Sequence, residues 1–527
     1  MRSRKTWSRS PRLFPALALF SMSVPGLTGC SQPGGDPTAV AEISEALLTP
    51  ATTNHEVAHA VLGARETSVA FSPYQRRWIV GFNSFTSTAT EAGWAYSSDP
   101  SGTSWTSSSI SSATAWGDPG SSPTNGSGFI GWRGDPSIAP ATNPSFNQKG
   151  LTMLYSMVGS SKSADASDVV IARSNDGGLT WGQAQYVNDA ASGGNVDNPV
   201  MDSNPVAPYH TYVAWTNGSG AWLNDVQYGP GNSFTKGTPT KIPPPPSAAV
   251  LHPNIAVGQY TTCGSEVHEA VYVAFTTSGG RCAFDGTAGV QSNSWWLALY
   301  DTVDKSWAGP WQMNSDDKWA NCVGTGYKIA NDPRPRIAVD SQSATFWTAH
   351  TQSSPYGTRP VMDWGGIVCS DGTTTPSVSH DQPYFCYPKF PGCNRDGQGW
   401  NDGSGNPIIQ DEWGPALAFT YQPGSPAVPR TVLTWYSTRD GAAHANQFAT
   451  IYMQYSEEKW ASGGGAPRAI SVKTAGSSET VPWDQTLSDW SDYQALGVNP
   501  LSGTILGAWG GDTRDGSTGR IYSTLLQ

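Results

Sequence analysis

Charged residues are scarce in this sequence, and positively charged residues are scarcer than negatively charged ones. Asp, Glu, Lys and Arg make up 13% of the 527 residues, and 30 Lys and Arg stand against 41 Asp and Glu. Nucleic-acid binding depends on clustered Lys and Arg. The composition therefore argues against a nucleic-acid partner.

The sequence also lacks helical periodicity and an apolar run that is long enough to span a membrane. The apolar run near the N-terminus begins at residue 13 and is interrupted by Pro15 and Pro25. A spanning helix needs about 20 apolar residues. We therefore interpret this run as part of a signal peptide rather than as a retained anchor.

The N-terminus has the layout of a lipoprotein export signal. Five basic residues precede the apolar run, which ends in Leu27-Thr28-Gly29-Cys30 and resembles the bacterial lipobox. We expect residues 1–29 to be removed, Cys30 to carry lipid and residues 30–54 to form a flexible tether. This places the protein in the cell envelope, attached to a membrane by its lipid. Ser31, rather than an Asp, follows the lipidated cysteine. By resemblance to Gram-negative lipoprotein sorting, this favours the outer membrane.

The expected mature chain is acidic and contains an even number of further cysteines. Removal of residues 1–29 takes away five basic residues and no acidic ones, which leaves 25 against 41 and a net charge of −16. The exported location favours disulfides over free thiols, although six cysteines allow about 15 pairings. No CxxC pair supports a zinc site. The six are Cys263, Cys282, Cys322, Cys369, Cys386 and Cys393.

A repeat of short β-branched and aromatic runs fills residues 55–527, separated by Gly, Pro, Ser and Thr. It predicts an all-β fold, a β-propeller with seven four-stranded blades, or six if residues 369–400 replace part of a blade. The last unit shows three strands, so we expect a strand near residues 57–62 to complete it. Most Trp residues are expected to pack between blades. The first strands begin near Thr67, Asp135, Asp197, His252, Asp332, Glu412 and Asp492.

Two segments follow the Asp-box pattern SxDxGxxW. Residues 174–181 match every defined position, and residues 97–105 match with one inserted residue. Asp and Ser side chains cap a tight turn in this motif, and Gly permits a positive φ. With the repeat, these motifs resemble the sialidase superfamily, in which they are structural. The motif residues are Ser174, Asp176, Gly178 and Trp181, and Ser97, Asp99, Gly102 and Trp105.

The resemblance implies a glycosidase site where the first strands begin, around the central axis. By strand position, Tyr493 is the expected nucleophile, Glu412 its activating base and Asp135 the acid/base. An anionic sugar would be held by Arg334, Arg336 and Arg439. The sequence lacks the RIP motif that sialidases carry in an early blade.

Other interpretations of the same positions stay open. The acidic strand starts could tie strand ends together or hold a structural Ca²⁺ ion, and no cofactor is required for catalysis. His252 also suits a polysaccharide lyase that acts on a uronic acid, as a base. A lipid-anchored propeller that binds glycan or protein without turnover is the alternative from another class. In each case we expect a monomer whose partner is an extracellular glycan or glycoconjugate.

Overall fold

The structure is a computed structural model in which contacts divide the chain into residues 1–47 and 48–527. All the described residues lie in the second unit. They are 55–60, 64–85, 90–110, 119–143, 148–161, 167–203, 210–228, 234–246, 248–277, 291–292, 295–313, 318–319, 335–341, 343–354, 357–380, 400–401, 407–408, 412–422, 428–437, 448–456, 470–473, 481–482, 494–512 and 519–526. The expected signal peptide, Cys30 and tether fall outside them. None of the described residues belongs to a helix that is long and apolar enough to cross a membrane.

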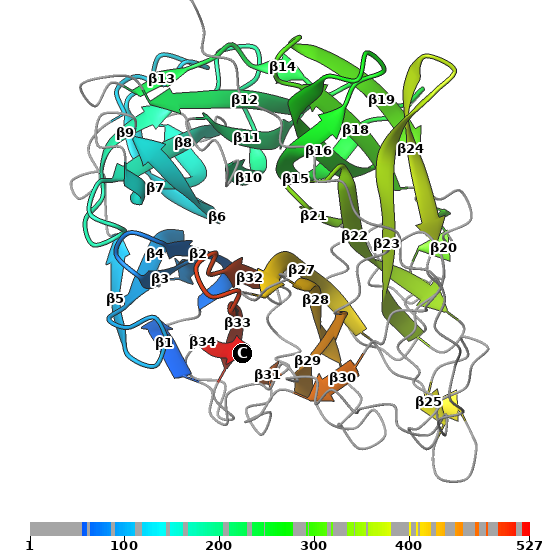
Figure 1. The fold of residues 1–527 in the computed structure, drawn as a ribbon. Helices are drawn as coiled ribbons and strands as arrows, with labels where there is room; N and C mark the ends of the chain where they lie inside the picture. Colours follow the sequence, from blue (N-terminus) through cyan, green and yellow to red (C-terminus); the bar gives the residue numbers. More distant parts are fainter. Residues whose placement is uncertain are drawn as a thin grey trace, which may run out of the picture. The chain divides into compact units, whose positions relative to one another are not determined.

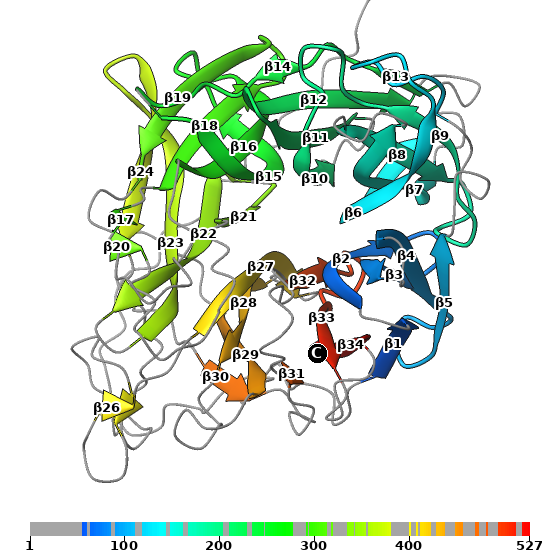
Figure 2. The same cartoon turned by 180° about the vertical axis from the view of Figure 1, so that it is seen from behind.

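Antiparallel sheets of four or five strands account for nearly all of the described chain (Figure 1). Seven such sheets occur, each beginning with a strand nearest the centre, and Figure 2 shows the same arrangement from behind. The predicted all-β class is therefore confirmed. The inner strands are β2 (Ala64–Ser72), β6 (Phe129–Asn143), β10 (Asp197–Ser203), β15 (Val250–Thr261), β21 (Arg336–Val339), β27 (Glu412–Gln422) and β32 (Ala495–Val498).

The outer strands follow each inner strand in chain order, with one exception in the last sheet. In the first three sheets they are β3 (Arg77–Phe85), β4 (Thr90–Ser97) and β5 (Trp105–Ile110); β7 (Gln148–Ser161), β8 (Ser167–Ser174) and β9 (Gly182–Tyr186); β11 (His210–Asn217), β12 (Gly220–Tyr228), β13 (Phe234–Lys236) and β14 (Thr240–Lys241). In the next three they are β16 (Val267–Thr277), β18 (Trp295–Asp301) and β19 (Ser306–Gln312); β22 (Thr345–Ser354), β23 (Gly357–Ser370) and β24 (Thr373–His380); β28 (Val428–Ser437), β29 (Phe448–Ser456), β30 (Ile470–Lys473) and β31 (Val481–Pro482). Two separate two-stranded sheets pair β17 (Gln291–Ser292) with β20 (Lys318–Trp319) and β25 (Trp400–Asn401) with β26 (Pro407–Ile408).

The last sheet joins the two ends of the described chain. Strands β32, β33 (Ile505–Asp512) and β34 (Gly519–Leu526) are completed by β1 (His55–Ala60), which pairs with β34. Arg520 also donates from Nη1 to Glu56 Oε2 at 2.6 Å. The expectation that an N-terminal strand completes the last unit is confirmed.

Contacts between neighbouring inner strands run from β2 through β6, β10, β15, β21 and β27 to β32, and β32 contacts β2. The sheets therefore close into a propeller, as predicted. Buried apolar clusters lie between neighbouring sheets, and Trp78, Trp215 and Trp295 are fully buried among them. For these three, the expected packing role is confirmed. The blade count of the whole chain stays a prediction, because segments between the sheets lie outside the described residues.

The inner strands share a bulge at their start. Five of them have a left-handed residue directly before a Thr or Pro, where pairing with the second strand shifts register. These residues are Glu66 (φ 54°), Asp135 (φ 54°), Asn198 (φ 53°), His252 (φ 48°) and Gly414 (φ 60°). Such bulges change the direction of a strand end, and they recur at the same end of these five sheets.

Polar side chains two residues after the bulge tie three of the described sheets to the next one. Backbone N–H groups donate to them in three places: Ile138 N to Ser68 Oγ (2.8 Å), Met201 N to Ser137 Oγ (2.9 Å) and Ile337 N to Asn254 Oδ1 (3.1 Å). Strand β10 differs, because Val200 stands at that position. There Asp202, two residues further on, accepts from Val257 N at 2.8 Å and from Ser203 N at 2.8 Å.

The complete Asp-box forms the turn between β8 and β9. Gly178 N donates to Ser174 Oγ at 2.8 Å, and Leu179 N and Thr180 N donate to Asp176 Oδ1 at 3.0 and 2.9 Å. The turn lies at the opposite end of the sheet from the bulge, because β6 begins at one end and β8 finishes at the other. Trp181 is buried in the core beneath it. In the second copy, Thr103 N and Ser104 N donate to Asp99.

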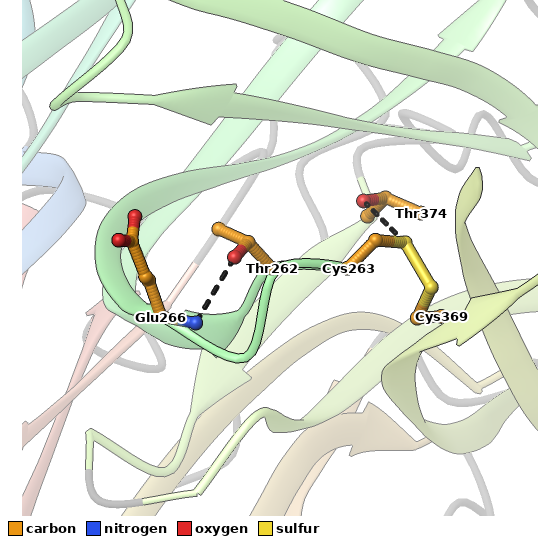
Figure 3. Close-up of a disulfide and its surroundings, with 5 residues drawn as sticks. All are labelled: Thr262, Cys263, Glu266, Cys369 and Thr374. Carbon is orange, nitrogen blue, oxygen red and sulfur yellow. Dashed lines mark hydrogen bonds between the residues drawn. A yellow bond between two sulfur atoms is a disulfide. The ribbon is translucent and has the colours of Figure 1, made fainter. Parts of the chain in front are cut away.

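A disulfide joins Cys263 to Cys369, so the expectation of disulfides is confirmed for one pair (Figure 3). Cys263 lies in the turn between β15 and β16, and Cys369 lies where β23 ends, so the bond links neighbouring sheets. The turn is itself held by Glu266 N, which donates to Thr262 Oγ1 at 3.2 Å. The other four cysteines outside the signal segment lie outside the described residues.

Replacing both bonded cysteines by Ser should lower the free energy of unfolding by about 2 to 5 kcal/mol. The bond closes a loop with a sequence separation of 106 residues, and a loop of about this length restricts the unfolded chain strongly. Denaturant titration, followed by tryptophan fluorescence, measures the effect. An unchanged midpoint in the Cys263→Ser, Cys369→Ser double variant would show that the bond does not stabilise the fold.

Stability should also fall as pH rises through the titration of Asp202. Burial raises the pKa of this carboxyl from an ordinary 3.8 to about 6. The folded chain therefore binds more protons than the unfolded chain between these values, and a contribution of up to about 3 kcal/mol is present below pH 4 and lost above pH 6. Unfolding midpoints measured from pH 4 to pH 7 test this.

The variant Asp202→Ala is the matched control for that titration. Ala occupies the equivalent position in neighbouring inner strands at Ala70, Ala139 and Ala256. The variant should lose this part of the pH dependence, whatever its absolute stability. The same pH profile in both proteins would assign the dependence to another group.

Candidate functional site

The starts of the seven inner strands surround a cavity of about 140 Å³ on the central axis. At about 30 Å³ each, this is room for four or five water molecules. Every inner strand contributes to its wall, which makes it the place where a ligand would meet all seven sheets. One polar or small residue from each sheet lines it: Ser68, Ser137, Asn198, Asn254, Arg336, Ala416 and Gln494.

Polar side chains, mostly uncharged, are common in the described lining of this cavity. Arg336 is its one charged residue, and Nε of Arg336 donates to Pro415 O at 3.2 Å. Gln494 Nε2 donates to Gly414 O at 2.9 Å. The described lining has no carboxylate, which is the main protein ligand of Ca²⁺. The calcium alternative stays a prediction.

Three consecutive bulge residues form a hydrogen-bonded group, which we call the mouth triad: Asp135, Asn198 and His252. Asn198 N donates to Asp135 Oδ2 at 3.1 Å, and Asn198 Nδ2 lies 3.3 Å from His252 Nδ1. Asn198 is 3% exposed and also lines the cavity. The structure thus connects two of the sequence-predicted site residues through a third that the sequence analysis missed.

Glu66 is a further residue that the sequence analysis missed. It occupies the bulge of β2, the neighbour of the bulge that carries Asp135, and Asn83 Nδ2 donates to Glu66 Oε2. Gly134 approaches Asn83 so closely that a Cβ there would lie 3.0 Å from the amide, which explains the glycine at this position. Glu66 is half-buried and carries a carboxylate at the same level of the ring as the mouth triad.

A short pattern in the sequence marks these positions. The pattern covers five residues. The bulge residue comes first and is variable, and Pro follows it in most copies. A small or polar residue and an aliphatic residue come next, and Ala is the fifth in most copies, as in residues 135–139, 252–256 and 334–338. In the third repeat the predicted strand start is Asp197, but Asp197 is exposed and Asn198 holds the bulge position. Alignment on the residue before Pro would have found Asn198.

The remaining predicted residues fall mostly outside the described part of the chain. Arg336 lines the cavity, whereas Arg334, Arg439 and Tyr493 lie outside the described residues. The backbone of Glu412 begins β27, and its side chain is not among those described. In the sequence, Arg334 and Tyr493 stand at the bulge position of their repeats. The clamp of three arginines and the nucleophile stay predictions.

The opposite end of β15 carries a second ionisable group. His268 Nδ1 and Tyr260 Oη each lie 2.6 Å from Asp301 Oδ2, and the bond to Asp301 holds the pKa of His268 above its ordinary value. Metal-ligating atoms of His268, Asp301 and Asp304 lie within 4.8 Å of one another. Both Asp301 oxygens are already occupied, since Oδ1 accepts from Val303 N and Asp304 N. The group therefore stabilises this turn.

Comparison with known proteins gives matches among solved structures only. No protein-family model matches the chain, and no curated protein matches it. The chain is similar to an α-L-arabinofuranosidase of Fusarium graminearum in complex with arabinobiose, with 11% identity, a TM-score of 0.41, and coverage of 90% of this chain and 97% of that one. It is similar to the polysaccharide lyase Uly1, with 9% identity, a TM-score of 0.41, and coverage of 93% and 94%. It is also similar to a mutant of the NanB sialidase of Streptococcus pneumoniae, with 7% identity, a TM-score of 0.35, and coverage of 90% and 70%.

Proposed function

We propose that this protein processes an extracellular glycan at the mouth of the propeller channel, as a sialidase-like glycoside hydrolase that acts on an anionic sugar. The observation that carries the proposal is the mouth triad, which joins Asp135 and His252 through Asn198, a residue of the polar cavity lining. A concave site with convergent polar groups on a rigid ring suits recognition of a sugar with many hydroxyl groups.

The roles of individual residues follow from their strand positions. Tyr493 is the nucleophile, activated by Glu412, because a neutral attacker avoids repulsion from an anionic sugar. Asp135 protonates the leaving oxygen. Arg336, at the cavity, binds the sugar's charged group together with Arg334 and Arg439, since guanidinium groups pair with carboxylates through two parallel hydrogen bonds.

A binding protein without turnover is the rival function, favoured by the missing RIP motif. A lyase that uses His252 on a uronic acid is the third. A glycan array shows whether the protein binds sugar at all. Chromogenic glycosides then report hydrolysis, and uronic-acid polysaccharides report elimination through the absorbance of the unsaturated product. The absence of both binding and turnover would overturn the glycan proposal.

Two substitutions separate a hydrolase from a binding protein. Tyr493→Phe and Asp135→Asn should each lower turnover by about 10²- to 10⁴-fold while glycan binding is kept. The fold should tolerate Asp135→Asn, because Asn198 occupies the equivalent left-handed position in the next sheet. Tyr74→Phe is the matched control, since Tyr74 is 48% exposed in the turn between β2 and β3. Unchanged turnover in both site variants would refute these roles.

The proposal includes attachment to the cell envelope through lipid on Cys30. In a bacterial host, the full chain should partition with membranes, and Cys30→Ala should release it or leave its signal peptide uncleaved. Fractionation followed by mass spectrometry of the N-terminus measures both outcomes. A soluble wild-type chain cleaved at another residue would contradict the attachment.

A further inference from the structure

Asn198 is joined to both of its neighbours in the mouth triad through different groups. Its backbone N–H donates to Asp135 Oδ2 at 3.1 Å, and its side-chain Nδ2 lies 3.3 Å from His252 Nδ1. Because the amide nitrogen has only hydrogens to offer, the facing ring nitrogen must accept. A neutral imidazole that accepts at Nδ1 carries its proton at Nε2.

The backbone conformation places Asn198 where it can make both bonds. Its φ of 53° lies in the left-handed region, as do those of Asp135 and His252. Three left-handed residues in neighbouring strands store backbone strain, which persists only where surrounding contacts hold it. The inter-sheet tie from Met201 N to Ser137 Oγ supplies such a contact, because Met201 follows Asn198 by three residues.

This orientation leaves the amide oxygen of Asn198 without a protein donor. Oδ1 is buried, has no hydrogen-bond partner, and belongs to a residue that lines the cavity. A buried acceptor without a partner is unfavourable, because it has lost its hydrogen bonds to water. This cost is removed when a hydroxyl group, of a sugar or of water, enters the cavity and donates to Oδ1.

From these contacts we infer that Asn198 is the positioning residue of the site. It fixes neutral His252 with its proton on Nε2, so that His252 offers the glycan a hydrogen-bond donor. Its backbone N–H also fixes the orientation of the Asp135 carboxyl group by donating to Oδ2, and its own Oδ1 accepts from a ligand hydroxyl. The mouth therefore recognises a sugar that presents an acceptor oxygen beside hydroxyl donors. These roles toward the glycan rest on the proposed function, whereas the fixed tautomer does not.

Two variants of Asn198 test the positioning role without disturbing the fold. Asn198→Gly removes the amide and keeps the left-handed backbone, since Gly414 has a φ of 60° at the equivalent position of another sheet. Asn198→Asp keeps the shape of the side chain and replaces its donor by an acceptor. Thermal unfolding should show that both variants are folded, with Asn198→Gly within a few degrees of the parent protein.

The tautomer of His252 is read directly from its ring nitrogens. Full-length protein labelled with ¹⁵N-histidine is studied by long-range ¹H–¹⁵N correlation at a pH above the titration of imidazole, and a His252→Gln variant assigns the signals. We expect the parent protein to show protonated Nε2. Asn198→Gly should shift the signals toward the mixed tautomers of free imidazole, and Asn198→Asp should move the proton to Nδ1.

Protonated Nδ1 in the parent protein would overturn the inference, because the amide would then be turned with its oxygen toward His252. The same signals in all three folded proteins would overturn it as well. Neither measurement needs a glycan, so the tautomer can be confirmed even if the array detects no sugar. A fixed tautomer with no glycan binding would refute the proposed function and leave the positioning role standing.

Discussion

Burial of both faces of every sheet is the constraint on which the rest of this structure depends. A single four-stranded sheet has two apolar faces and two open edges. Exposure of the faces to water costs free energy, and the unpaired edges invite aggregation. Here each sheet packs its faces against the sheets before and after it, and large side chains such as Trp78 and Trp295 fill the space between them. Closure of the ring, from β32 back to β2, gives each of the seven described propeller sheets a neighbour on both faces.

The ring also explains why polar chemistry gathers on the axis. Near the centre the inner strands are crowded, so the positions that face the next sheet carry Ala or Gly in six repeats and hydrogen-bonded Asp202 in one. In five inner strands the bulge turns one residue out of this packing, always near the start of the strand. As a result, Glu66, Asp135, Asn198 and His252 come from segments almost 190 residues apart in sequence and share one rim.

Much of the fold could be predicted from the sequence, because local patterns specify it. The strand alternation, the Asp-box at Ser174 and the completing strand near Val57 all have short-range signatures. The pairing of Cys263 with Cys369 could not be predicted, since it depends on which two turns the closed ring brings together. At the site, Asp135 and His252 were found through their charge, whereas Asn198 was missed because its importance lies in its backbone conformation and its two hydrogen bonds.

The pairing of β1 with β34 has a consequence for how the molecule is made. Arg520 and Glu56 are 464 positions apart, so β1 can pair with β34 only after the whole segment between them has been synthesised. Until then one face of the first sheet is uncovered and the ring stays open. Contacts between segments so far apart in sequence also form slowly. A chain that is still being synthesised would thus expose apolar sheet faces, so this protein should depend on holdase chaperones until β34 has emerged from the ribosome.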